Sequence, residues 1–160
     1  MSARVVLVVE DGTEYIDAFR RLAGADETFE FLRAGDAGEA RRILAERPVD
    51  AIFLDVAFDR IPPERLEGAI EPLAEERFGG DRLRAQRHLA SQQGFYIAAA
   101  LVDSIRRGTR VFIAFDFSAE PERLEALRTG LPGLEGMREG TPISRILDRM
   151  RKPRPISDSV

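Results

Sequence analysis

Short apolar runs alternate along the chain with segments whose apolar residues recur at helical spacing. The first run, residues 4–9, reads Arg-Val-Val-Leu-Val-Val without polar alternation, which is typical of a strand buried on both faces of a parallel sheet. We expect further strands at 28–32, 51–54, 110–115 and, more weakly marked, 134–138.

Helical spacing and capping residues predict a helix after each strand. Thr13 precedes a helix that would turn Tyr15, Ile16, Phe19 and Leu22 inward. Further helices are expected over 94–107 and 122–128. Two more are expected to begin at Asp36, which stands three residues before Glu39, and at Pro142. This alternation predicts an α/β fold: a doubly wound, flavodoxin-like sheet of five parallel strands with helices on both faces.

The segment 59–93 interrupts the alternation between the third strand and the helix that follows it. Pro62-Pro63, Pro72 and Gly79-Gly80 break it, so we expect a helical insertion with short helices over 64–69 and 82–90. Residues 1–152 are predicted to form a single domain that includes this insertion. The last residues, 153–160, contain two prolines and little to bury and are predicted to be a flexible tail.

Composition narrows the function classes. The chain has 160 residues, 44% of them hydrophobic, and a net charge of −4, so a broad surface for nucleic acid is not expected. It has no cysteine, which excludes disulfides, zinc–thiolate sites and a cysteine nucleophile. The longest apolar run, 95–102, is too short to cross a bilayer, and the N-terminus lacks a signal-peptide layout. We therefore expect no membrane association and a cytoplasmic location.

Three acidic residues follow strands that a doubly wound sheet places side by side. Glu10 and Asp11 come directly after the first strand, and Asp55 follows the third. Clustered carboxylates repel one another, and a hard divalent cation such as Mg²⁺ would relieve that repulsion. A carboxylate beside bound Mg²⁺ can also attack a phosphoryl group. Mg²⁺ is therefore the candidate cofactor.

The residues around these carboxylates resemble a bacterial response-regulator receiver domain of the CheY-like type. The resemblance rests on Val-Leu-Val-Val-Glu-Asp at 6–11, on Phe-Leu-Arg-Ala-Gly-Asp-Ala-Gly-Glu-Ala-Arg-Arg-Ile-Leu at 31–44 and on Pro-Val-Asp-Ala-Ile-Phe-Leu-Asp-Val at 48–56. It covers 4–57 well and 94–151 loosely, and the insertion has no counterpart. The resemblance implies that Glu10 and Asp11 bind the metal, that Asp55 accepts the phosphoryl group, and that Ala57 gives the metal a backbone carbonyl.

Two further positions depart from the family pattern. Where the family has a Thr or Ser that meets the phosphoryl group, this chain has Asp116, with Ser118 as the alternative hydroxyl. Where the family has a Lys, counting back from Pro142 gives Arg138, either as a phosphate contact or as an ion-pair partner of Asp55 or Asp116. Lys152 is the single lysine of the chain and follows the last helix, so it cannot take this role.

Three functions stay open on this sequence. The first is an atypical stand-alone receiver in a phosphorelay that acts through protein–protein contact, with a histidine kinase or another signalling protein as partner and Asp55 as phosphoacceptor. The second is a pseudo-receiver that works without phosphorylation. The third is a Toprim-like, Mg²⁺-dependent nuclease or phosphotransfer enzyme, which 8–14 and 112–118 faintly resemble. The oligomeric state is open, a dimer included.

The remaining candidates have plainer interpretations. His88, the single histidine, is interpreted as a solvated surface residue, and Arg82, Arg84 and Arg87 as a solvated helix face. Phe95 and Tyr96 are interpreted as core residues and not as a platform for a ligand. Neither a P-loop nor a dinucleotide-binding glycine motif is present.

Overall fold

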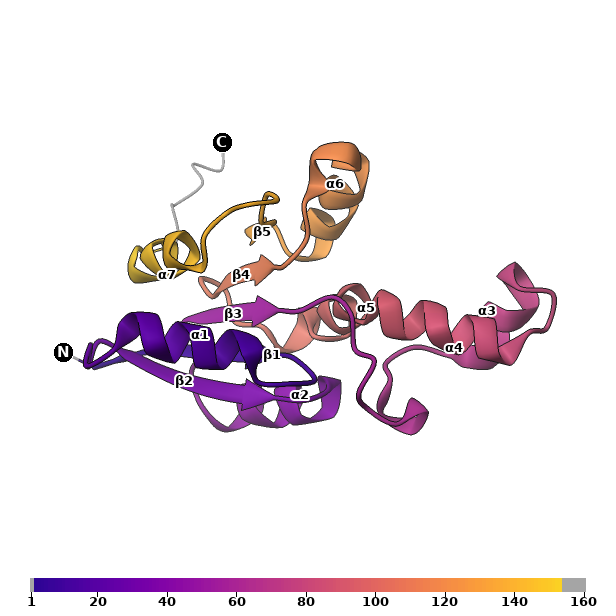
Figure 1. Cartoon of the computed structure of the whole chain (residues 1–160), viewed down its shortest axis with the longest axis horizontal. Helices are drawn as coiled ribbons and strands as arrows, with labels where there is room; N and C mark the ends of the chain where they lie inside the picture. The colour runs from indigo at the N-terminus through magenta and orange to yellow at the C-terminus, as the bar shows by residue number, and fades with distance from the viewer. Residues whose placement is uncertain (1, 154–160) are drawn as a thin grey trace.

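The central element is a sheet of five parallel strands in the order β2-β1-β3-β4-β5 (Figure 1). A computed structural model describes residues 2–153, so the predicted tail lies, apart from Pro153, outside the described residues. The strands are β1 (Arg4–Val9), β2 (Phe29–Ala34), β3 (Ala51–Leu54), β4 (Arg110–Ile113) and β5 (Leu134–Glu135). The predicted doubly wound, flavodoxin-like fold is confirmed.

Helices cover both faces of the sheet and define two hydrophobic cores. One face carries α1 (Glu14–Ala23) and α7 (Ile143–Arg151), which bury Phe19 and Ile146 against Val6 and Val8 of β1. The other carries α2 (Ala37–Glu46), α5 (Gln93–Ala100) and α6 (Pro121–Gly130), packed against Leu7 and its neighbours. Successive β1 residues thus point into opposite cores, which is why the strand shows no polar alternation.

Several predicted boundaries are wrong at their ends. β2 runs on to Ala34 because it pairs with β1 as far as Val9. β5 has two residues where five were predicted, since it pairs only with Val111 and Phe112 of β4. Leu22 is 50% exposed; it lies six residues after the buried Ile16 and so about 120° from it around the helix axis.

Further helix ends also differ from the expected ones. The helix predicted over 94–107 stops at Ala100, and a short 3₁₀ turn, Val102–Ser104, follows it. The helix predicted over 122–128 extends to Pro121–Gly130. Among the described residues no helix combines the length and apolar character that crossing a bilayer requires.

The insertion forms an arm, residues 59–92, that projects from the body of the molecule (Figure 1). It contains a 3₁₀ turn (Pro63–Arg65) and two helices, α3 (Ile70–Arg77) and α4 (Arg82–Ser91), which pack against each other. The helix predicted over 64–69 is wrong, because α3 begins at Ile70 and takes Pro72 into its first turn, where a missing N–H costs no hydrogen bond. The predicted second helix is confirmed.

Gly94 joins the base of the arm to the end of β3. Its N–H donates to the carbonyl oxygen of Val56 at 2.9 Å. A Cβ at this position would overlap the carbonyl oxygen of Asp55, so only glycine lets α5 begin this close to the strand end. The arm is held a second time by the Phe58 N–H, which donates to the carbonyl oxygen of Ala90 at 2.8 Å. The arm and the loop after β3 are therefore one connected unit.

Candidate functional site

The site lies where β1 and β3 end next to each other at the carboxyl edge of the sheet. Val9 and Leu54 are paired in register, and the Asp55 N–H donates to the carbonyl oxygen of Val9 at 2.9 Å. Glu10 and Asp55, which follow these residues, are thereby brought to the same edge, together with Asp11. This edge is where doubly wound sheets bind ligands.

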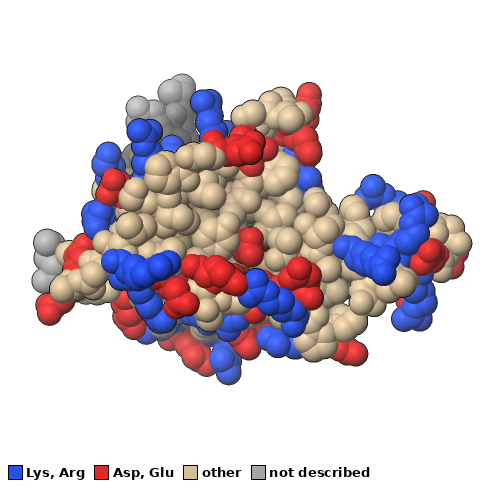
Figure 2. Space-filling model, in the orientation of Figure 1, with Lys and Arg blue, Asp and Glu red and all other residues tan. Residues whose placement is uncertain are grey.

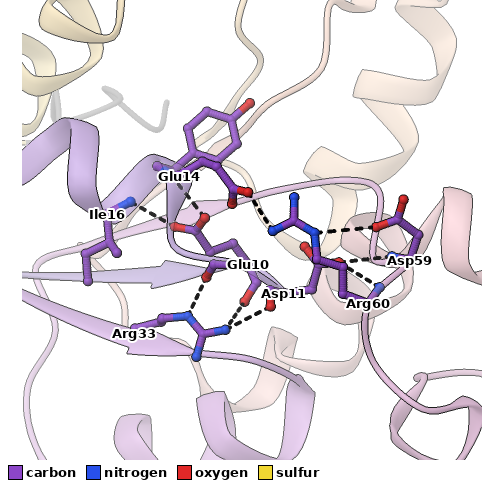
Figure 3. Close-up of polar contacts among 9 residues, drawn as sticks. Glu10, Asp11, Glu14, Ile16, Arg33, Asp59 and Arg60 are labelled. Carbon is purple, nitrogen blue, oxygen red and sulfur yellow. Dashed lines mark hydrogen bonds and ion pairs between the residues drawn. The ribbon is translucent and has the colours of Figure 1, made fainter.

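Glu10 caps the first helix with its side chain. Its carboxyl is buried, at 1% exposure, and both oxygens are engaged: Oε1 accepts the Tyr15 N–H at 3.1 Å and Oε2 accepts the Ile16 N–H at 2.8 Å (Figure 3). These N–H groups have no partner inside α1, and a carboxylate also suits the positive end of the helix dipole. Thr13, the predicted cap, makes no side-chain capping bond.

Asp11 holds the loop that follows β3. Its Oδ2 accepts the N–H groups of Asp59 and Arg60, each at 3.0 Å (Figure 3). The carboxylate thus fixes the first residues of the arm against the end of β1. One of its two oxygens is committed to structure.

Two arginines supply positive charge to this acidic edge. Arg33, from β2, donates through Nε to the carbonyl oxygen of Gly12 at 2.5 Å and through Nη2 to those of Glu10 and Asp11 at 3.2 and 3.1 Å (Figure 3). Arg60 pairs with Glu14. Neither arginine was predicted to take part in the site, although Arg33 directly follows the second predicted strand.

Asp55 is partly buried among these charges. Its Oδ1 accepts the Val56 N–H at 2.8 Å. Burial, reinforced by the carboxylates of Asp11 and Glu10, raises the pKa of Asp55 to about 6. Tyr15 lies close enough that burial and the Asp55 charge raise the pKa of its hydroxyl. Ala57 is exposed in the next loop, and its metal-binding role stays a prediction.

The two residues predicted at the switch position bind each other. Asp116 Oδ1 accepts the Ser118 N–H at 2.9 Å and the Ser118 hydroxyl at 2.5 Å, while Oδ2 accepts the Glu139 N–H at 2.9 Å. These hydrogen bonds, that from Glu139 first, lower the pKa of Asp116 to about 2. The position therefore carries a negative charge at neutral pH, and the serine hydroxyl donates to that charge.

Arg138 is exposed and follows β5 by three residues. In residues 2–153 no ion pair joins its side chain to Asp55 or Asp116, so the predicted ion pair is not formed, although its charge contributes to the lowered pKa of Asp116. The chain continues beside the end of β4 after β5, where the Met137 N–H donates to the carbonyl oxygen of Phe115 at 2.9 Å, and the Arg138 side chain is exposed there. Lys152 lies at the C-terminal end of α7.

The predicted metal ligands do not fit Mg²⁺ as they are arranged here. Across the described part of the chain, no group of three or more His, Asp or Glu side chains is placed to hold a metal ion. Glu10 uses both carboxylate oxygens on α1, and Asp11 uses one on the arm. Mg²⁺ demands nearly ideal octahedral oxygen geometry, which this arrangement does not offer. The Toprim hypothesis needs Glu10 as a ligand and meets the same obstacle.

Glu10→Gln tests the capping role. Glutamine has one acceptor oxygen and would aim an NH₂ group at a helix N–H, so we expect the free energy of unfolding to fall by about 1–3 kcal/mol. Urea denaturation measures it. The matched control is Glu14→Gln, which loses an exposed ion pair and should lower the free energy of unfolding much less. Equal losses in the two variants would contradict the capping role.

Asp55→Asn tests the buried charge. Folding raises the pKa of this carboxyl from 3.8 to about 6, so its ionised form destabilises the fold above pH 6. At neutral pH the free energy of unfolding of the variant should therefore be higher than that of the wild type by up to about 3 kcal/mol. This gain should vanish below about pH 4, where Asp55 is protonated in the folded and in the unfolded state. Asp116→Asn should change stability in the opposite direction, since folding lowers that pKa. A loss of stability in Asp55→Asn at neutral pH would contradict this account.

Comparison with known proteins places the fold. No protein-family model matches the chain, and no curated protein matches its sequence. The receiver domain of the Francisella response regulator 1452 is similar in structure, with a TM-score of 0.56, 14% identity, and coverage of 92% of this chain and 93% of that one. The Vibrio cholerae chemotaxis protein CheY4 is similar with a TM-score of 0.55, 14% identity, and coverage of 94% and 98%.

A third similar structure is that of a protein named as an adenylate cyclase and not as a response regulator. The adenylate cyclase from Rhodopirellula baltica matches with a TM-score of 0.57, 15% identity, and coverage of 93% of this chain and 85% of that one. Similarity at such identities concerns the backbone arrangement and not the chemistry. Together with the strand order β2-β1-β3-β4-β5, it shows that this chain has the CheY-like fold of response-regulator receiver domains.

Proposed function

We propose that this chain is a pseudo-receiver: a signalling module that acts through protein contact and is not switched by phosphorylation of Asp55. The observation that carries the proposal is the use of Glu10 and Asp11, whose carboxylates bind backbone N–H groups of α1 and of the arm. A metal could use both oxygens of Glu10 only by competing with these bonds, and only the second oxygen of Asp11 has no N–H partner among the described residues. Because Glu10 is buried, each N–H group left without its acceptor would cost about 1–3 kcal/mol of stability.

The charges around Asp55 support the same proposal. A phosphoryl group there would add negative charge beside Asp11, Glu10 and Glu14, the carboxylates that already raise the pKa of Asp55. Asp116, at the place of the family's Thr or Ser, is anionic and binds the Ser118 hydroxyl. Arg138 is exposed and makes no ion pair to the site within the described residues.

The arm is the proposed contact surface. It projects from the body, and arginine side chains lie on its visible face, with acidic ones among them (Figure 2). Its α4 contributes Arg82, Arg84 and Arg87, next to Leu83, whose side chain is 53% exposed. Arginine is enriched in protein interfaces. The partner we propose is a signalling protein with an acidic surface.

The alternative is a phosphorelay receiver with a histidine kinase as partner, and a small phosphodonor separates the two. We expect incubation with acetyl phosphate and Mg²⁺ to leave the intact mass of the protein unchanged, because both oxygens of Glu10 and one of Asp11 are already engaged. Intact-mass spectrometry measures this, with Asp55→Asn treated in parallel. Addition of one phosphoryl group that is lost in Asp55→Asn would refute the pseudo-receiver proposal.

A further inference from the structure

A cavity of about 450 Å³ opens between α3 and α4 of the arm, α5 and α6. Among its lining residues are Arg77, His88, Tyr96, Ala99 and Arg123. Its volume lies within the range of sites for small molecules. The cavity exists because the arm stands beside α5.

The polar lining of the cavity is basic. Two guanidinium groups and an imidazole line it, and no carboxylate is among its lining residues. Nη1 of Arg77 lies 3.4 Å from Nε2 of His88, and in residues 2–153 that nitrogen is the one hydrogen-bond partner of the Arg77 side chain. Burial and the charges of Arg77 and Arg123 lower the pKa of His88. The cavity thus holds a positive charge that its own lining does not neutralise.

Arg123 is held rigidly at the opposite wall. Its guanidinium carbon lies 3.6 Å from the centre of the Phe95 ring, a stacked position. Nη2 donates to Oε1 of Gln92 at 2.6 Å, and Nη1 donates to Oε2 of Glu120 at 3.2 Å. Glu120 is exposed and offsets part of this charge, whereas Arg77 forms no ion pair with any carboxylate in the described part of the chain. A ligand would therefore meet a fixed planar cation on one side and a free cation on the other.

The apolar lining adds aromatic surface. Phe95 and Tyr96 are adjacent residues of α5, and Ala99 follows them one turn later with an exposed side chain. Planar groups stack on aromatic rings and on guanidinium planes alike. The lining therefore offers contacts to both an anionic group and an aromatic ring.

We propose that this cavity binds a small anion that carries a planar aromatic ring, of the class of nucleoside monophosphates, with Arg77 and His88 meeting the phosphate and Tyr96 and Arg123 flanking the ring. The site is separate from Asp55 and does not depend on the proposed function. It also revises the interpretation of His88 and Tyr96 as a solvated residue and a core residue.

His88 makes the proposal directly testable, because the chain has one histidine and its imidazole signals report on this cavity alone. The experiment follows these signals by NMR in the full chain while adenosine monophosphate is added. We expect a saturable shift. Adenosine and inorganic phosphate, added separately, should each bind about tenfold more weakly or worse, because each lacks half of the recognised chemistry. Phosphate binding as tightly as adenosine monophosphate would overturn the aromatic part of the proposal.

Variants distinguish a built site from general attraction to the arginines of α4. Arg77→Gln should weaken binding about tenfold or more, whereas Arg87→Gln, which removes the same charge from exposed α4 outside the cavity, should change it by less than about twofold. Ala99→Trp fills the cavity without changing charge and should abolish binding. Circular dichroism checks that each variant is folded. No shift of the His88 signals at millimolar nucleotide, or equal weakening in Arg77→Gln and Arg87→Gln, would refute the site.

Discussion

The buried carboxylate of Glu10 is the contact on which the carboxyl edge of the sheet depends. It binds the N–H groups of Tyr15 and Ile16 and so fixes where α1 begins relative to β1. A buried carboxylate needs such partners, because an uncompensated charge would cost far more than a hydrogen bond returns. The Glu10 carboxylate, which a metal site would require, is therefore bound to the start of α1.

The charged residues next to Glu10 also bind backbone groups. Asp11 binds the start of the arm, and Arg33 binds the carbonyl oxygens of the loop after β1. Asp55 is left partly buried between carboxylates, with a pKa raised to about 6. Through Gly94, which fits against the Asp55 backbone, the same edge anchors α5 and the arm. The carboxyl edge thus serves as the anchor of an extended arm, and the cavity beside α5 is a consequence of that anchoring.

The fold could be predicted from the sequence because the apolar runs and the helical spacing reflect burial on two faces of one sheet. Strand ends were less predictable, since the length of β5 depends on its partner β4 and not on its own residues. The proximity of the carboxylates was also accessible from the sequence. The direction in which the carboxylates point could not be predicted, because Glu10 and Asp11 bind backbone N–H groups, which every sequence offers. The lack of a lysine beside Asp55 was the sequence signal that pointed in the same direction.

The most direct test of this account asks whether Mg²⁺ can take the carboxylates of Glu10 and Asp11 from their backbone partners. Nitrogen-15 NMR of the amides of Tyr15, Ile16, Asp59 and Arg60, recorded while Mg²⁺ is raised to millimolar concentration, measures this. The account predicts no saturable shift at these four amides. Saturable shifts concentrated on them would show that the carboxylates rotate to bind the metal, and would contradict it.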